Sequence, residues 1–581
     1  MQHETNQTSA MAKVMDFNDG LELSILDQIC SRSYTRLLYC FSLPVAINED
    51  ETQSLVERFR HATNQIIGKW PFLGSKIRLR DPKEPAGEVE LFWTRDRNPL
   101  PIDKHRWFST DGVLRFKGVE EWGAKGAPNY SDLVSRGVPP SMLGDHEFCH
   151  VPHEPSLEAR KGWPVYQITV NFTRGGLMLC ICFANSVIDS YAHGIIFEEF
   201  AKQVRDWREP VNGMDKSVGQ TQYRSKQIDM TALAGVNIDW TRESCPELLP
   251  PTPPSLKGPV GPAGITASSK YGLSKYGLSK SKSSKSKSLE SKSSKSKSSE
   301  SKPSKSKPSK SKSSESKPSK SKPPSVTGRV FSFPMEVLER QQQLLHTHFC
   351  TDTAGRPKVT YQLGEILVAW VWGSMVRARI REDTEDTKGR HLPFSKHVPT
   401  LLTFSMNVRS QLGIPDGEKY LRNAILYNCV ELKSSDMIRK EGMEPGKILH
   451  RVTRTFHNRA QSFDAKAVRI RLEYMSRIWE HPGSVEYQAD SADENDVIVD
   501  WLLAPGRQTY FGSALISGQT IELGQPEFVR ELPGSHAPGR CAVLPRNLGH
   551  KVPFEVYIQL DEDAMERLTE RLKRGGVRCI Q

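Results

Sequence analysis

Apolar positions recur with both strand-like and helix-like spacing along the first part of the chain, 21–229. The segment 36–41, which is apolar after Arg36, is typical of a buried strand, and the apolar residues of 51–70 follow helical spacing. The segments 165–170 and 176–183 flank a glycine-containing turn and predict a pair of strands. This part of the chain is therefore predicted to be a mixed α/β unit.

The same mixture returns after residue 329 and continues to the end of the sequence. The predicted elements are a long helix at 361–377, strands at 400–407, 424–430 and 555–560, and a last helix at 562–572. Between the two parts, 246–324 begins with a proline-rich stretch and continues as Ser-Lys and Ser-Lys-Pro repeats. Such a segment has too few apolar residues to offset its ordering entropy, so we expect a disordered crossover between two α/β parts.

The predicted organisation has four parts. These are a disordered tail at 1–16, an N-terminal lobe at 17–235, a disordered linker at 236–327 and a C-terminal lobe at 328–581. Two interpretations of the linker stay open. It can be an expanded spacer, or it can be a charged arm for docking or phosphorylation, because each phosphoserine would add about −2 to its charge.

The net charge does not indicate a nucleic-acid-binding protein. Residues 269–325 contain 17 Lys and 3 Glu, a net charge of +14, whereas the whole chain carries +12. The remainder thus carries −2, and the basic isoelectric point belongs to the linker and not to a folded surface. We expect no nucleic-acid partner.

Cysteine usage and hydropathy predict a cytoplasmic protein without a membrane segment. The ten Cys form no C-x-x-C pair, the first residues are polar, and no apolar run approaches the ~18–20 residues of a membrane span. The sequence from His146 to His150 matches the spacing of a zinc motif. Prolines on both sides leave no room for the stable helix that this motif requires, so we expect no metal.

The segment 183–190 has the most informative chemistry. It ends an apolar strand, and its polar residue Asn185 is followed four positions later by Asp189. Apolar residues then repeat at helical spacing, and either Asp189 or Ser190 can cap that helix. Asn185 and Asp189 are therefore predicted to share one strand-to-helix loop.

Six blocks in order give the chain a family resemblance. They are 23–28, 70–77, 183–190, 407–410 with 420–424, 524–530 and 543–546. Together they resemble BAHD-type acyltransferases, in particular the fungal branch that includes trichothecene O-acetyltransferase-like enzymes. The resemblance implies an α/β fold of two chloramphenicol-acetyltransferase-like lobes with a channel between them. It also implies acyl-CoA as a co-substrate, without a tightly bound cofactor.

The resemblance further assigns roles to individual residues. In that family a catalytic His stands where Asn185 stands here, and the motif Asp, here Asp189, is structural and pairs with an arginine of the other lobe, here Arg409. The C-terminal family motif corresponds to Tyr510, Phe511 and Gly512, with Tyr510 in place of an Asp. Phe511 and Gly512 are expected to shape the channel.

The replacement of His by Asn185 leaves the source of the general base open. A carboxamide does not titrate near neutrality and cannot take a proton from an attacking hydroxyl. His193, which lies one turn into the predicted helix, is either a substitute base or a core histidine.

Two functions follow from these features. We expect an acyl-CoA-dependent O-acyltransferase, most simply an acetyltransferase, that acts as a monomer on a small-molecule acceptor of fungal specialised metabolism. The alternative is a catalytically impaired acyltransferase-fold protein that binds a ligand or a partner. A peptide-synthetase condensation domain would share the fold but lacks the blocks at 26–28 and 524–530.

Overall fold

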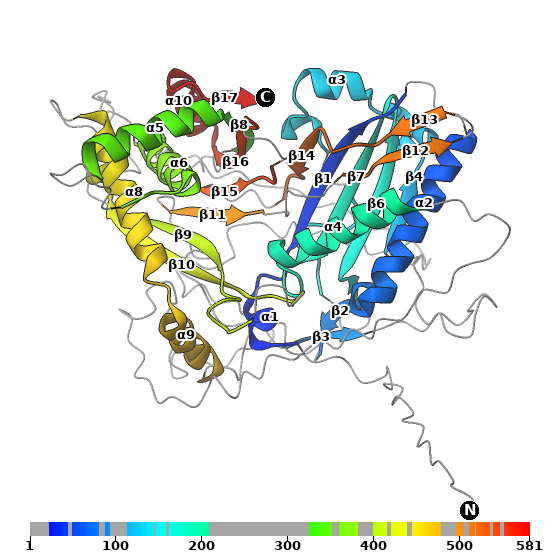
Figure 1. Cartoon of the computed structure of the whole chain (residues 1–581), viewed down its shortest axis with the longest axis horizontal. Coiled ribbons are helices and arrows are strands. Elements are labelled where there is room, and N and C mark those ends of the chain that lie inside the picture. The colour runs from blue at the N-terminus through cyan, green and yellow to red at the C-terminus, as the bar shows by residue number, and fades with distance from the viewer. Residues whose placement is uncertain are drawn as a thin grey trace, which may run out of the picture. The chain divides into compact units, whose positions relative to one another are not determined.

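Two large β-sheets, one of five strands and one of seven, organise the computed structural model of the chain (Figure 1). The structure describes residues 23–44, 49–80, 88–92, 113–144, 147–157, 162–207, 325–350, 359–380, 399–414, 420–438, 444–477, 496–502, 510–516, 519–534, 538–546 and 551–580. The predicted tail at 1–16 and residues 236–324 of the predicted linker lie outside these ranges. β8 begins at Val326, two residues before the predicted start of the second lobe.

The first lobe is built on the five-stranded sheet, with the strand order β14-β1-β7-β6-β4. Its strands are β1 (Tyr34–Ser42), β4 (Leu114–Lys117), β6 (Tyr166–Thr173), β7 (Gly176–Ala184) and β14 (Phe528–Glu531). β6 and β7 are buried along their whole length, but only β7 is a continuous apolar run. β6 alternates apolar residues with polar residues that are buried as well, namely Gln167, Thr169, Asn171 and Thr173. The three strands predicted in this lobe are confirmed.

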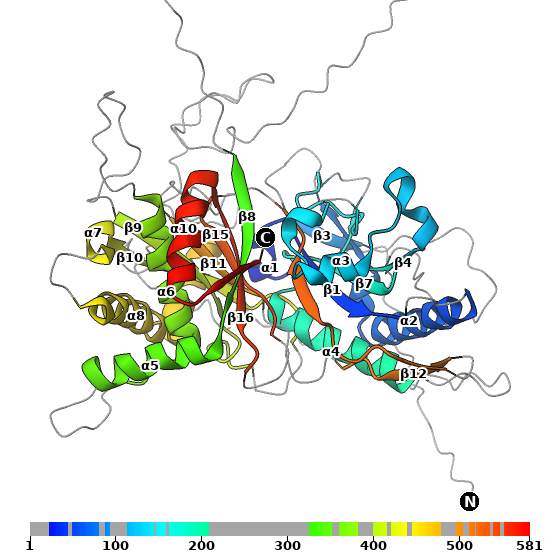
Figure 2. The same cartoon turned by 90° about the horizontal axis from the view of Figure 1, so that it is seen from above.

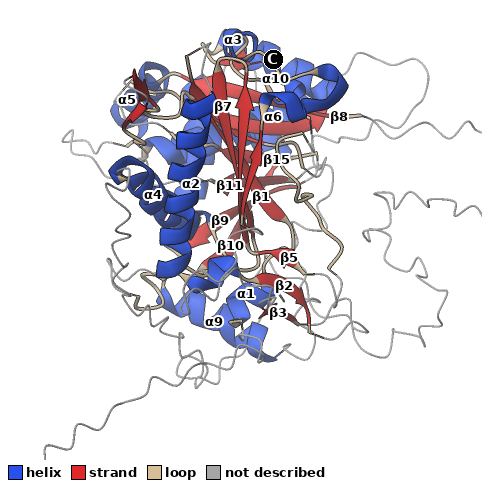
Figure 3. Ribbon diagram, turned by 90° about the vertical axis from the view of Figure 1, so that its right-hand side faces the viewer, coloured by secondary structure: helices blue, strands red, loops and turns tan. Residues whose placement is uncertain are grey.

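Two long helices, α2 (Glu49–Lys69) and α4 (Ser190–Asp206), lie side by side along one face of this sheet (Figure 3). Tyr39 of β1 stacks on Phe197 of α4, with ring centroids 4.0 Å apart. The helix predicted at 51–70 is confirmed as α2. The smaller elements are α1 (Ile25–Ile29), η1 (Pro71–Gly74), η3 (Val119–Lys125), α3 (Tyr130–Ser135), η4 (Pro140–Met142), a sheet of β2 (Lys76–Leu79), β3 (Val89–Phe92) and β5 (Trp163–Pro164), and a pair of β12 (Ser513–Ile516) and β13 (Gln519–Glu522).

The C-terminal half of the chain contributes an edge strand to the first sheet. β14 pairs antiparallel with β1, so that Leu37 faces Glu531 and Cys40 faces Phe528 across the two strands. The sequence does not predict this pairing, because β14 has only four residues and its partner lies almost 500 positions earlier. The two sheets are therefore joined through β14 as well as by side chains.

The second lobe is built on the seven-stranded sheet, with the order β10-β9-β11-β15-β16-β8-β17. Its strands are β8 (Val326–Phe333), β9 (Pro399–Asn407), β10 (Ile425–Lys433), β11 (Val497–Trp501), β15 (Arg540–Val543), β16 (Phe554–Asp561) and β17 (Arg578–Ile580). Its helices are α5 (Met335–Phe349), α6 (Leu363–Arg379), α7 (Ser434–Met437), α8 (Pro445–Gln461), α9 (Ala465–Arg477) and α10 (Glu562–Arg574).

Helices α6 and α10 pack their apolar side chains against one face of the second sheet, in a core that also includes Phe404, Val499 and Ile558 of its strands. Figure 2 shows these helices on the side of the sheet away from the first lobe. Val330, Ala542 and Tyr557 on the other face of the sheet pack into the core of the first lobe. None of the helices in the described part of the chain combines the length and the apolar character that a bilayer crossing requires.

Candidate functional site

The loop that joins β7 to α4 holds the two residues singled out in the sequence. Asn185 follows directly after β7, and Asp189 is the N-cap of α4. The Asp189 backbone is extended and its Oδ1 accepts a hydrogen bond from Ala192 N at 2.8 Å, which satisfies one of the free amides at the start of the helix. The sequence prediction of a strand, a capped loop and a helix is confirmed here.

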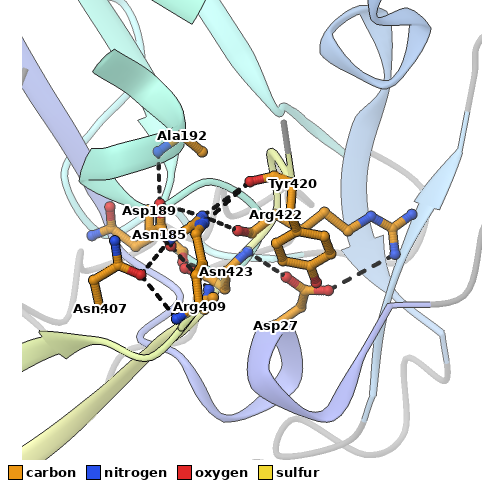
Figure 4. A network of polar contacts seen from close by, with 10 residues as sticks. Asp27, Asn185, Asp189, Ala192, Asn407, Arg409, Tyr420, Arg422 and Asn423 are labelled. Carbon is orange, nitrogen blue, oxygen red and sulfur yellow. Dashed lines mark hydrogen bonds and ion pairs between the residues drawn. The ribbon is translucent and has the colours of Figure 1, made fainter. Parts of the chain in front are cut away.

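Asp189 meets Arg409 of the second lobe in a buried ion pair (Figure 4). Arg409 Nη1 lies 2.9 Å from Asp189 Oδ2, and Nη2 donates to Oδ1 at 3.0 Å. The side chains are 7% and 1% exposed. Asp189 Oδ2 also accepts from Ala424 N at 2.9 Å, so both carboxylate oxygens are occupied and the residue is not placed to take a proton from a substrate.

The Arg409 guanidinium binds main-chain carbonyl groups of the loop that precedes β10. Its Nη2 donates to Tyr420 O at 3.2 Å and to Arg422 O at 2.8 Å, and its Nη1 donates to Asn407 Oδ1 at 3.1 Å. The guanidinium also lies 4.5 Å from the centre of the Tyr191 ring, at the first turn of α4. One arginine therefore connects the end of β9, the loop before β10 and the start of α4.

The Asn185 side chain is held by polar groups on both of its ends. Thr35 Oγ1 donates to its Oδ1 at 2.7 Å, and its Nδ2 donates to Ser33 Oγ at 3.0 Å. Its main-chain carbonyl accepts from Asn423 Nδ2 at 2.6 Å. The carboxamide thus donates one hydrogen bond and accepts one from neighbouring hydroxyl groups, and it has no group that titrates near neutrality.

A second buried carboxylate, Asp27, ties α1 to the same loop. Its Oδ1 accepts from Asn423 N at 3.2 Å, and its Oδ2 accepts from Ser24 N and Ser24 Oγ at 2.9 and 2.8 Å. Arg422 Nη1 lies 3.9 Å away. Burial raises the pKa of the Asp27 carboxyl to about 6, although Arg422 and the Ser24 hydrogen bonds lower it in part.

Asp27, Asn407, Tyr420 and Asn423 were not identified as site residues from the sequence. Each lies within a block quoted for the family resemblance, at 23–28, 407–410 or 420–424. The polar character of these residues within the blocks was the one sequence feature that could have marked them as candidate site residues. Only the folded structure shows that these blocks meet at one place.

His193 is a core histidine and not a substitute base. Its ring is fully buried and stacks on Phe183 with centroids 4.4 Å apart. Tyr39 Oη lies 2.9 Å from Nε2, and Tyr166 Oη lies 3.4 Å from Nδ1. Burial lowers the pKa of His193 to about 3, so its ring stays neutral and enclosed.

Phe511 and Gly512 pack against the first lobe at the far end of α4. The Phe511 ring is buried, with its centroid 5.0 Å from that of Phe41. Gly512 has φ +73, and a Cβ there would lie 2.6 Å from the side chain of Arg205. Arg205 Nη1 in turn donates to Tyr510 O at 3.2 Å. The two residues anchor a segment of the C-terminal half on the first lobe.

The described part of the zinc-like motif, residues 147–150, consists of a turn and bends and not of a helix. Within the described ranges, no group of three or more His, Cys, Asp or Glu side chains is arranged to hold a metal ion.

Comparisons with known proteins identify fungal relatives. No protein-family model matches the chain. It is 21% identical over 573 residues to the O-acetyltransferase astG of Aspergillus oryzae, which covers 93% of this chain and 98% of the relative. It is 24% identical over 181 residues to the eremophilane O-acetyltransferase ORF8 of Penicillium roqueforti, which covers 31% of this chain and 34% of that protein.

Solved structures show the same fold. The structure of F. sporotrichioides TRI101 complexed with coenzyme A and T-2 matches 97% of this chain and 100% of its own, with a TM-score of 0.60 and 12% identity. That of F. graminearum TRI101 with coenzyme A and deoxynivalenol matches to the same extent, also with a TM-score of 0.60. The predicted two-lobe acyltransferase fold and the resemblance to the fungal branch are confirmed.

Proposed function

We propose that this chain, as a relative of fungal O-acetyltransferases with the two-lobe fold of TRI101, is an acyl-CoA-dependent O-acyltransferase. The observation that carries the proposal is the match to an O-acetyltransferase along 93% of the chain, which includes both lobes. Acetyl-CoA is the proposed acyl donor, and no further cofactor is required. The acceptor is a hydroxyl group of a small specialised metabolite.

The relatives suggest where to look for the acceptor. One acts on eremophilanes, and TRI101 has been crystallised with T-2 and with deoxynivalenol. We therefore place hydroxylated terpenoids first among the acceptors of this chain. We further propose that it acts as a cytoplasmic monomer, with lobes at 17–235 and 328–581.

The site residues fit this function in defined roles. Asp189 and Arg409 hold the loop between β7 and α4 against the second lobe, and this fixes position 185 at the junction of the two lobes. Asn185 stands at the position of the family base without supplying a proton acceptor. Phe511 and Gly512 keep the C-terminal motif on the first lobe.

The test uses purified full-length protein, acetyl-CoA and a panel of alcohols that begins with eremophilane and trichothecene alcohols. Release of free CoA and the mass of the ester are followed together. We expect an ester with at least one acceptor, and its loss in Asp189→Ala. Protein that neither binds acetyl-CoA in calorimetry nor forms an ester with any alcohol would contradict the proposal.

A further inference from the structure

The face of the second sheet opposite to α6 and α10 carries a row of polar side chains. Tyr427 of β10 pairs with Ser405 of β9, and Asp500 of β11 pairs with Ala542 of β15. Arg540 lies two positions before Ala542 on the same strand. Directly paired residues, and residues two apart on one strand, lie on the same face of a sheet. Asp500 and Arg540 therefore share a face, opposite to the one that buries Val499 under the helices.

Arg540 connects this row to the first sheet. Its Nη2 donates to Glu531 Oε1 at 2.8 Å, and its Nε lies 3.5 Å from Asp500 Oδ2. The Tyr427 hydroxyl donates to Asp500 Oδ1, also at 3.5 Å. Glu531 belongs to β14 of the first sheet, so the row continues from one lobe into the other.

Glu531 lies on the face of the first sheet that carries the motif loop. It pairs with Leu37 of β1, and Thr35 is two residues earlier on the same strand. Thr35 is the residue that donates to the Asn185 carboxamide. Figure 1 shows β11 directed toward the first lobe, with its arrowhead on the side of α4. The polar row thus runs toward the place where the family base is missing.

The carboxylates at the lobe junction differ in their exposure to solvent and in the number and length of their hydrogen bonds. Asp189 is 1% exposed and Asp27 is fully buried, and both bind several donors at about 3 Å or less. Glu531 is 3% exposed in its side chain and bound to Arg540. The Asp500 side chain is 21% exposed, and its contacts with Arg540 Nε and Tyr427 Oη are long, at 3.5 Å each. Asp500 is therefore the carboxylate best able to receive a proton from a bound molecule.

We propose that Asp500 is the proton acceptor of the acyl transfer, in place of the imidazole that Asn185 lacks. This inference rests on the proposed function. Asp500 takes the proton of the acceptor hydroxyl while the oxygen bonds to the thioester carbonyl carbon. The carbon–sulfur bond then breaks, and the CoA thiolate takes the proton back from Asp500, so the carboxylate is restored after each turnover.

The charged or titratable groups near Asp500 are the Arg540 guanidinium, the Tyr427 hydroxyl and the Glu531 carboxylate, which binds the same arginine. Burial raises the pKa of the Glu531 carboxyl, and the charge of Asp500 raises it further. Arg540 and Arg36 lower this pKa in part. The Tyr557 hydroxyl is a further titratable group near Glu531. The two carboxylates share one guanidinium, that of Arg540.

The test compares Asp500→Asn with Glu555→Gln. Glu555 is a matched control because its side chain is also 21% exposed and it also pairs with an arginine of the other sheet, Arg530, at 2.7 Å. We expect Asp500→Asn to bind acetyl-CoA as the unmodified protein does and to lose about 10²–10⁴-fold in single-turnover transfer. We expect Glu555→Gln to stay within about threefold of the unmodified protein.

The outcomes separate the two proposals. Transfer by Asp500→Asn at the control's rate would overturn the role of Asp500 and leave the proposed function intact. An equal loss in both variants would show a packing role and would also overturn it. Unmodified protein that makes no ester contradicts the proposed function, and the role of Asp500 falls with it. Addition of formate to Asp500→Ala should restore part of the transfer, which a packing role would not allow.

Discussion

Asp189 and Arg409 are 220 positions apart in the chain and meet in an ion pair of 2.9 Å in which both side chains are at least nine-tenths buried. The same carboxylate caps α4 and binds the amide of Ala424. A single residue thereby sets the start of a helix in one lobe and the path of a loop in the other. Because Asn185 lies in the same loop as Asp189, its position relative to the second lobe depends on this ion pair.

Asp189→Asn should destabilise the protein strongly. Asparagine also caps helices well, so the change removes the charge and keeps the cap. It leaves Arg409 buried without its counter-ion, which typically costs about 3–5 kcal/mol of the free energy of unfolding. Urea denaturation at neutral pH measures the loss.

The control for this prediction is Asp436→Asn. Asp436 and Arg451 are also 2.9 Å apart, but their side chains are 37% and 42% exposed. Exposed pairs contribute about 0–1 kcal/mol, so this variant should stay close to the unmodified protein. Similar losses in the two variants would show that burial of the Asp189 pair is unimportant.

Asn185→His should act differently in two backgrounds. With Asp500 present, a new imidazole adds a second base to a site that already has one, and we expect less than a tenfold change in transfer. In the Asp500→Asn background the imidazole becomes the acceptor and should raise transfer at least tenfold, within the usual range of general base catalysis of about 10²–10⁴. Single-turnover rates with acetyl-CoA measure both effects, and a double variant no faster than Asp500→Asn would contradict the prediction.

His193 should make stability depend on pH between about 3 and 6.5. Its pKa in the folded protein is lowered to about 3 by burial, while the unfolded chain keeps the ordinary histidine pKa of 6.5. The unfolded state therefore binds more protons in this window, and stability falls as the pH drops below 6.5. At pH 5 the loss relative to pH 7 is on the order of 2 kcal/mol.

His193→Phe removes this contribution and should flatten the change of the urea midpoint between pH 7 and pH 5. The exposed His348 provides the control, because His348→Asn should keep the pH dependence of the unmodified protein. An unchanged pH dependence in His193→Phe would show that the ring is not the group responsible.

Gly512→Ala should destabilise the protein by about 1–2 kcal/mol, because φ +73 lies in the left-handed region that side chains with a Cβ disfavour. The added Cβ would also approach the Arg205 side chain at 2.6 Å. Gly68→Ala is the opposite case, since nothing lies within 4 Å of a Cβ there and the residue belongs to α2. That variant should gain about 0.5–1 kcal/mol in the same thermal or urea measurement. A neutral Gly512→Ala would contradict the prediction.

Local patterns in the sequence were enough to find the elements around the motif. The run 176–183 is β7, because a strand buried on both faces is apolar throughout, and the helical spacing after Asp189 is α4, because a helix that buries one face repeats apolar residues every three or four positions. The cap at Asp189 was predictable for the same reason, since it involves residues three positions apart. The family resemblance, and not the local pattern, pointed to Arg409 as a partner.

Other features of the site have no local signal. β14 is too short to predict, and its partner β1 lies at the opposite end of the chain. The clamp of Ser33 and Thr35 around Asn185 joins groups about 150 positions apart, and each of these residues is ordinary in its own segment. Asp500 likewise looks like any polar residue beside a strand until β11 is placed in the sheet.

Residue type and spacing within about twenty positions predicted the longer helices and the buried strands of two α/β parts, because burial of apolar side chains imposes these patterns. That Asn185 takes the place of a catalytic His is an expectation from the family resemblance. The three-dimensional structure was needed to show that both Asp189 oxygens accept hydrogen bonds, that His193 is enclosed and that Asp500 lies beside Arg540 with a partly exposed carboxylate. Burial and hydrogen-bond partners are set by strand order and lobe packing, which bring together residues hundreds of positions apart.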